Sequence, residues 1–139
     1  MLVPSEAGAP AWVAAANGDP EFVACSQGWV GSLAAAVFPD ASYSGGPHYL
    51  RLTGADGHWS SVEYGSDPAL THLTRFWLYA PYGVWKDVIG QQIDPIRAII
   101  LGRARIHGQL SAVLRWTKAM RRMTVLAGGL PTEFVDDRG

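Results

Sequence analysis

Apolar residues near the start of the chain recur with the period of a helix. Within residues 20–38 they return every three or four positions, which predicts a helix with one buried face. That face comprises Phe22, Cys25, Trp29, Leu33 and Val37. Asp19 is the expected N-cap, and Pro20 suits the first helical position because its missing N–H needs no partner there. A shorter helix is predicted before it, over residues 10–18.

The pattern changes to that of strands after the proline and glycine residues of segment 38–47. Segments 48–54 and 58–65 flank Asp56-Gly57, a dipeptide that suits a tight hairpin turn. Segment 72–80 is rich in β-branched and aromatic residues, which favours a third strand. The middle of the chain is therefore predicted to form part of a sheet.

Two short helices with marked ends are predicted next. The first covers residues 81–90, and its inner side comprises Trp85, Val88 and Ile89. Asp94 and Pro95 are expected to cap and start the second, which Gly102 ends. These boundaries favour short helices that reverse direction tightly.

A final strand and a final helix complete the pattern. Residues 103–108 alternate, which predicts a half-buried strand with Arg103, Arg105 and His107 on one side and Ala104 and Ile106 on the other. Residues 110–127 have a wide apolar helical face made of Leu110, Val113, Leu114, Trp116, Thr117, Met120, Met123 and Thr124. The whole pattern predicts a small antiparallel sheet that includes 48–54, 58–65, 72–80 and 103–108, covered by helices near 20–38 and 110–127.

Composition narrows the class of protein. The 139 residues fit one domain, 1–139, and 48% of them are hydrophobic. A net charge of −1 argues against a generally basic nucleic-acid binder, and one cysteine cannot form an internal disulfide. The N-terminal segment does not resemble a signal peptide, and no apolar run approaches the roughly 20 residues of a membrane span. We therefore expect a cytoplasmic protein.

Charge is nevertheless distributed unevenly. Residues 95–132 include seven Arg or Lys residues and no acidic residue. A basic face is predicted from Arg103, Arg105, Arg115, Lys118 and Arg122. Such a face suits an anionic membrane surface or an acidic protein, and an ordinary solvated surface is the alternative interpretation.

Motifs for catalysis, metal binding or nucleotide binding are not evident. The four histidines are scattered, without the spacing of metal ligands, and no nucleophile elbow or phosphate-binding loop occurs. Cys25 lies on the predicted buried face, which indicates a small apolar residue rather than a nucleophile. We predict no catalytic residue, no metal site and no cofactor.

The stretch "IGQQIDPIRAIILGRARIHGQLSAVL" resembles the lipid-binding family of sterol carrier protein, type two. The resemblance rests on Gly90, Asp94-Pro95, an apolar helix over 98–101, and the basic-apolar alternation between Gly102 and Gly108. It covers about residues 71–127. It implies an α+β fold with helices on one face of a mainly antiparallel sheet of four to five strands. It also implies non-covalent carriage of a lipid or other apolar molecule in a tunnel between sheet and helices.

Under this resemblance we expect seven apolar side chains to line the tunnel: Trp77, Trp85, Ile89, Ile100, Val113, Trp116 and Met120. About a dozen buried methylenes at about 0.8 kcal/mol each exceed the roughly 8 kcal/mol of micromolar binding, so no catalytic group is needed. Two alternatives stay open. One is a protein-interaction module with a closed cavity; the other is a small enzyme that uses His72 or His107 with an aspartate. The sequence also leaves open whether the chain forms a homodimer.

Overall fold

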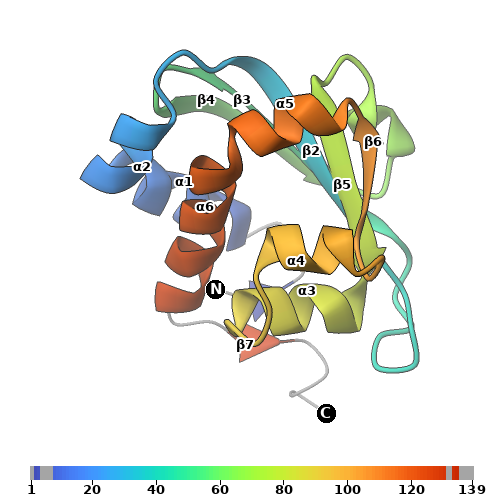
Figure 1. Cartoon of the computed structure of the whole chain (residues 1–139). Helices are drawn as coiled ribbons and strands as arrows, with labels where there is room; N and C mark the ends of the chain where they lie inside the picture. The colour runs from blue at the N-terminus through green and yellow to red at the C-terminus, as the bar shows by residue number, and fades with distance from the viewer. Residues whose placement is uncertain (1, 4–7, 131–132, 135–139) are drawn as a thin grey trace.

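The computed structural model describes residues 2–3, 8–130 and 133–134 and shows one layer of helices on one face of a sheet (Figure 1). The strands of this sheet are β2 (Val30–Phe38), β3 (His48–Ala55), β4 (His58–Gly65), β5 (Phe76–Pro81) and β6 (Arg105–Gly108). The helices are α1 (Gly8–Asn17), α2 (Pro20–Cys25), α3 (Tyr82–Ile89), α4 (Pro95–Ile100), α5 (Leu110–Arg115) and α6 (Thr117–Gly129), with the 3₁₀ turn η1 (Pro68–Thr71). The short strands β1 (Leu2–Val3) and β7 (Glu133–Phe134) pair with each other.

The five strands are ordered β4-β3-β2-β5-β6 across the sheet. Neighbouring strands are antiparallel except β2 and β5, which are parallel. The α+β class and the mainly antiparallel sheet of four to five strands are confirmed, and the number of strands is five. None of the described helices is long and apolar enough to cross a bilayer.

The prediction of one helix over residues 20–38 is wrong, because this segment contains both α2 and the central strand β2. The helix ends at Cys25. Gly28 and Gly31 have φ angles of 89° and 120°, a backbone region that glycine enters without strain and that a helix does not use. Beyond them Ala34 and Ala36 are fully buried in the middle of the sheet. Tertiary pairing with two strands therefore outweighs the helical propensity of alanine.

The helix boundaries read from Asp19 and Asp94 are confirmed. The Asp19 carboxylate accepts from the backbone N–H of Phe22 at 2.7 Å, and the Asp94 carboxylate accepts from that of Ile96 at 2.8 Å. Gly102 follows α4 with a φ of 74°, the left-handed conformation expected after a helix.

The predicted helix over 110–127 is divided at Trp116. This residue leaves helical geometry, with φ −104° and ψ 19°, and separates α5 from α6. The break turns Leu110 and Leu114 outward, where they are 52% and 53% exposed. The apolar face predicted for a single straight helix therefore holds for α6 but not for these two leucines.

Candidate apolar-ligand site

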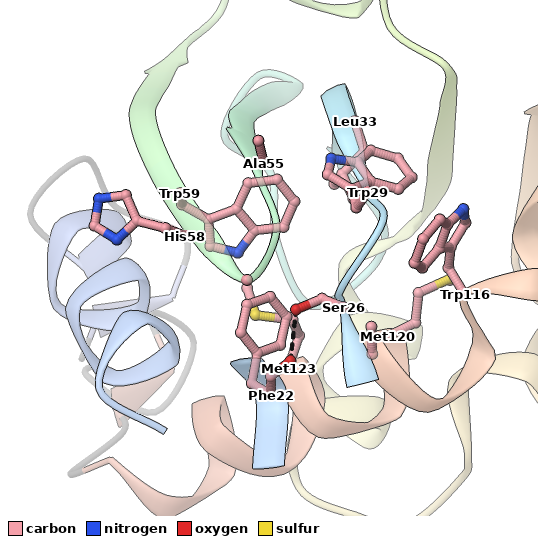
Figure 2. Close-up of a pocket in the computed structure, with 12 residues that line it drawn as sticks. Phe22, Ser26, Trp29, Leu33, Ala55, His58, Trp59, Trp116, Met120 and Met123 are labelled. Atoms are coloured by element: carbon pink, nitrogen blue, oxygen red, sulfur yellow. Dashed lines mark hydrogen bonds between the residues drawn. The ribbon is translucent and has the colours of Figure 1, made fainter. Parts of the chain in front are cut away.

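The largest aromatic cluster of the core surrounds a small cavity between the sheet and the helices α2 and α6 (Figure 2). Twelve residues line it: Phe22, Ser26, Trp29, Leu33, Ala55, Gly57, His58, Trp59, Trp116, Ala119, Met120 and Met123. Its volume is about 30 Å³. Since one water needs roughly 10–15 Å³ measured in this way, the space suits a water or two rather than a lipid.

One wall forms where the β3–β4 turn docks on α2. Asp56 and Gly57 have φ angles of 49° and 86°, as the predicted tight turn requires. The Asp56 carboxylate accepts from the backbone N–H of Gly28 at 2.8 Å, and its carbonyl accepts from the Gln27 side chain at 2.8 Å. A Cβ at Gly57 would lie 2.8 Å from the Cα of Val23. Only glycine lets the turn approach the helix this closely.

Trp29 lies at the centre of the aromatic cluster. Its ring meets those of Trp59, Phe76 and Trp116 edge to face, with centroids 6.2, 5.7 and 5.4 Å apart. Its indole N–H donates to the carbonyl of Gly31 at 3.1 Å. Each such aromatic pair stabilises the packing by about 0.5–1.5 kcal/mol beyond area burial. The cluster therefore holds the cavity closed.

The opposite wall comes from α6 and is tied to α2 by an ion pair. Arg122 donates to both carboxylate oxygens of Asp19 at 2.8 Å and lies 3.2 Å from Glu21. The hydrogen bond from Arg122 lowers the pKa of Asp19 to about 2. The same carboxylate also caps α2, so one residue fixes the start of the helix and its distance from α6. Arg122 is thus a structural contact whose charge is paired within the fold, and its predicted part in a basic docking face stays a prediction.

Trp59 is positioned by hydrogen bonds to its backbone and by a bulge in β4. Asn17 accepts from its backbone N–H at 2.7 Å and donates to its carbonyl at 2.9 Å. A β-bulge beside Gly54 shifts the register, so that Trp59 and Val62 both face the helices although strict alternation would place them on opposite faces. The side chain is 6% exposed, and its indole nitrogen has no hydrogen-bond partner among the described residues.

Comparisons with known proteins show which solved structures share this architecture. No protein-family model and no curated protein sequence matches the chain. A solved structure of a conserved hypothetical protein from Thermus thermophilus, described as possibly sterol carrier protein, matches with a TM-score of 0.81 at 21% identity, over 93% of this chain and 90% of the other. A crystal structure of sterol carrier protein 2 matches with a TM-score of 0.79 at 23% identity, over 89% and 95%. The chain has the sterol carrier protein fold.

A third match is more distant. The structure of palmitated SCP2L2 from Aedes aegypti has a TM-score of 0.50 at 13% identity and covers 79% of this chain and 85% of the other. At these identities the comparisons establish the shared fold. The resemblance read from residues 71–127 is therefore confirmed as a statement about architecture.

Within the sterol carrier fold, two of the seven predicted lining residues line the cavity described above. Trp116 and Met120 both contribute to its wall, at 5% and 8% exposure. Val113 is fully buried in the same core without lining the cavity. Contact of any of these residues with a ligand stays a prediction.

Trp85 and Ile89 are placed elsewhere in the helical layer. Trp85 lines a second space of about 20 Å³ between α3, α4 and β5, and its indole N–H donates to the carbonyl of Ala36 at 2.9 Å. Ile89 packs with Ala127 and Trp12 in a separate small cluster. Neither of the two cavities, each within the described residues, joins Trp85 or Ile89 to Trp116 and Met120.

For Trp77 and Ile100 the prediction of a buried lining is wrong. In β5, Phe76 and Leu78 face the helices, so Trp77 lies on the opposite face, where its ring contacts that of Tyr79 at 4.8 Å. Ile100 is 77% exposed at the end of α4. The first error is one of strand phase, and the second follows from assuming that every apolar residue of a short helix is buried.

Sequence reasoning missed Trp59 and Trp29 as wall residues. Trp29 lies beyond Cys25, where the predicted helix does not continue, and the bulge that turns Trp59 inward has no unambiguous sequence signature. Gly54 was the available signal, since a glycine inside a strand often marks a bulge.

The described residues offer few groups for other chemistry. No three His, Cys, Asp or Glu side chains among them come together as metal ligands. His72 and His107 line one open hollow with Arg75, but no carboxylate contributes to its wall. Cys25 packs against the core, and burial raises the pKa of its thiol. The cavity wall, by contrast, is almost entirely apolar.

Proposed function

We propose that the protein binds an apolar small molecule or lipid non-covalently between the sheet and helices α2 and α6, and carries it without chemical change. The observation that carries this proposal is the cavity of about 30 Å³, whose wall is aromatic and aliphatic apart from Ser26 and His58. Support also comes from the fold, since sterol carrier protein 2 and the palmitated SCP2L2 protein share it. A cytoplasmic place of action is part of the proposal, and cell fractionation tests it.

Binding requires the cavity to open. A drug-sized ligand occupies about 300–1,000 Å³, far more than the present space. Met120 and Met123 form much of the α6 wall, and methionine is unbranched and adapts its shape to what it contacts. We propose that these side chains move first, while the Asp19–Arg122 pair keeps α2 and α6 together at one end.

The energy of apolar burial is sufficient for such opening. About a dozen ligand methylenes contribute roughly 10 kcal/mol before ordering costs. Separating two or three aromatic pairs of the Trp29 cluster costs about 1–4 kcal/mol. The difference of about 6–9 kcal/mol corresponds to dissociation constants from below one to tens of micromolar. We therefore expect moderate affinity and fast exchange rather than permanent retention.

Displacement of a neutral fluorescent probe, N-phenyl-1-naphthylamine, tests this proposal. We expect the probe to bind the full chain and to be displaced by C12 aliphatic compounds at micromolar concentrations. Met120→Gln, which puts a polar group on the wall, should weaken probe binding at least tenfold. Leu114→Gln is the matched control, because Leu114 is exposed on α5. Absence of saturable probe binding would contradict the proposal.

A closed interaction module is the second candidate. The small volume and the edge-to-face packing around Trp29 favour it, since both describe a filled core. Native mass spectrometry of protein purified from its own host separates the two functions. A bound small molecule supports carriage, whereas a stable complex with another protein and no small molecule supports the module.

A carrier must also meet the surface that holds its cargo, and α5 suits this task. Of the predicted basic face, Arg103 is paired with Asp87 at 2.7 Å and Arg122 with Asp19. Arg115 and Lys118 are exposed and form no ion pair with another described residue. They follow the exposed Leu110 and Leu114 in the chain, with Arg115 at the end of α5 and Lys118 in the first turn of α6. We name Leu110, Leu114, Arg115 and Lys118 the α5 surface.

We propose that the α5 surface docks on anionic membranes. Its leucines can enter the headgroup region while its two cations remain with lipid phosphates. Each basic residue contributes about 1 kcal/mol at an anionic surface, so Arg115→Gln with Lys118→Gln should weaken binding to phosphatidylserine vesicles roughly 30-fold at low salt. Ser42→Asp with Ser44→Asp changes net charge equally at an exposed loop and serves as control. Equal losses in both pairs would contradict a localised docking surface.

A further inference from the structure

The cavity wall is mainly apolar, yet it includes a buried polar group without a hydrogen-bond partner among the described residues, the indole N–H of Trp59. The Trp59 side chain is 6% exposed, and no described residue accepts a hydrogen bond from its nitrogen. Tryptophan N–H groups usually find a partner when buried, because an unmet donor loses its hydration without compensation. The donor therefore suits an acceptor that enters the cavity.

The direction of this donor is fixed by the surrounding chain. Asn17 holds the Trp59 backbone with two hydrogen bonds, and the bulge beside Gly54 turns the residue toward the helices. The ring packs against Phe22 with centroids 6.0 Å apart. In Figure 2 the indole nitrogen lies on the edge of the ring that faces Phe22 and Ser26, inside the group of lining side chains.

Trp116 gives an internal comparison. Its indole nitrogen is also buried without a partner among the described residues. In Figure 2, however, this nitrogen lies on the ring edge turned away from the other labelled side chains. Of the two tryptophans, Trp59 alone therefore combines a buried, unpartnered donor with an orientation into the cavity.

The rest of the wall decides which acceptor fits. The Ser26 hydroxyl donates to the carbonyl of Phe22 at 2.5 Å, which leaves its oxygen able to accept from a ligand hydroxyl. The only titratable lining residue, His58, is exposed, and its imidazole points away from the other labelled side chains in Figure 2. Arg75 and Arg115 stack on the rings of Trp29 and Trp116, and neither is a lining residue.

A carboxylate in this cavity would lose its hydration and meet no cationic lining residue. A neutral hydroxyl or carbonyl oxygen needs only the single donor that Trp59 offers. We propose that the cavity takes neutral lipids whose apolar chain ends in one hydroxyl or carbonyl oxygen, and that the Trp59 N–H binds this oxygen. The inference rests on the proposed function, because it identifies the polar group of the same ligand and the residue that binds it.

Three C12 probes of similar length test the inference: 1-dodecanol, 1-chlorododecane and dodecanoate. Each is titrated against N-phenyl-1-naphthylamine bound to the full chain at neutral pH. We expect 1-dodecanol to bind about three- to tenfold more tightly than 1-chlorododecane, the worth of one net hydrogen bond, and dodecanoate to bind more weakly than 1-dodecanol. Trp59→Phe should lower the affinity for 1-dodecanol more than that for 1-chlorododecane, so that the preference for the alcohol disappears.

Trp116→Phe is the matched control, because it shortens a lining ring without removing a donor that points into the cavity. It should change the affinities of both neutral probes by the same factor. If Trp59→Phe does not fold, benzothienylalanine at position 59 removes the N–H and keeps the ring shape. An alcohol preference that survives at this position, or equal binding of all three probes by the native chain, overturns the inference while carriage stands. Failure of every probe to bind overturns the proposed function itself.

Discussion

Replacing Gly57 with alanine tests how closely the β3–β4 turn must approach α2 to build the cavity wall. The new Cβ would lie 2.8 Å from the Cα and 2.9 Å from the carbonyl oxygen of Val23, both of them backbone atoms that cannot rotate away. The residue also has a φ of 86°, which an alanine adopts at a cost of about 1–2 kcal/mol. Overlap with packed atoms adds about 1–3 kcal/mol.

Part of this cost is offset in the unfolded chain. Alanine restricts the unfolded state more than glycine does, which returns about 0.4–1 kcal/mol. The net loss for Gly57→Ala is then about 1–5 kcal/mol in the free energy of unfolding. Urea titration followed by tryptophan fluorescence measures it, and an unchanged slope against urea shows that the compactness of both states is preserved.

Alanine substitutions at two other glycines separate the cost of the positive φ angle from the cost of the close contact. Gly102 has a φ of 74° but nothing within 4 Å of its virtual Cβ, so Gly102→Ala reports the conformational cost alone. Gly46 has neither a φ in the left-handed region nor a close neighbour, so Gly46→Ala should be neutral or slightly stabilising. We expect the loss at Gly57 to exceed that at Gly102 by about 1–3 kcal/mol. Equal losses at these two positions would refute the close contact between the turn and α2.

Three further predictions concern the walls of the cavity. Because the folded pKa of Asp19 is about 2, below the roughly 3.9 of an unfolded aspartate, its pairing stabilises the fold above about pH 4 and this contribution disappears as the pH falls toward 2. Asp19→Asn keeps a capping side chain, so urea titrations from pH 6 to 2 should show a weaker pH dependence than in the native chain. Cys25 should react slowly with a thiol reagent at neutral pH, because burial raises its pKa; rapid reaction of the folded protein would count against this. Met120→Gln should cost about 1–3 kcal/mol of stability by burying an amide, and a cost no larger than that of Leu114→Gln would place Met120 outside the core.

The parts of the fold that local chemistry determines could be predicted from the sequence. Asp19 and Asp94 start helices because a short acidic side chain reaches the first free N–H groups, whatever surrounds the helix. The Asp56-Gly57 turn forms because both residues tolerate positive φ angles. These signals lie within a few residues of the structure they produce.

The parts that depend on distant partners could not be predicted in this way. Segment 30–38 has the composition of a helix and becomes a strand because β3 and β5 pair with both of its edges. Trp77 lies on the sheet face away from the helices, because pairing with the neighbouring strands fixes the phase of β5. Trp59 lies on the face toward the helices, because the bulge shifts the register of β4. Resemblance over residues 71–127 supplied the fold class but not these details.

The candidate site shows the same division. Met120 was found because α6 keeps a regular helical period. Trp116 lies at the break before α6 and still lines the cavity. The other side of the cavity, with Phe22, Trp29 and Trp59, depends on the true end of α2 and on the bulge. The ion pair of Arg122 could not be predicted from the charge pattern, because its partner Asp19 is 103 residues away in the chain.

Methionine methyl NMR tests the central claim most directly, because the chain has three methionines and two of them line the cavity. Protein labelled with ¹³C at the methionine methyl groups is titrated with 1-dodecanol. The account predicts saturable shifts of the Met120 and Met123 signals and nuclear Overhauser contacts from both methyl groups to the alkyl chain. Signals that stay unchanged at saturating 1-dodecanol, with no such contacts, would contradict binding of an apolar molecule between the sheet and α6.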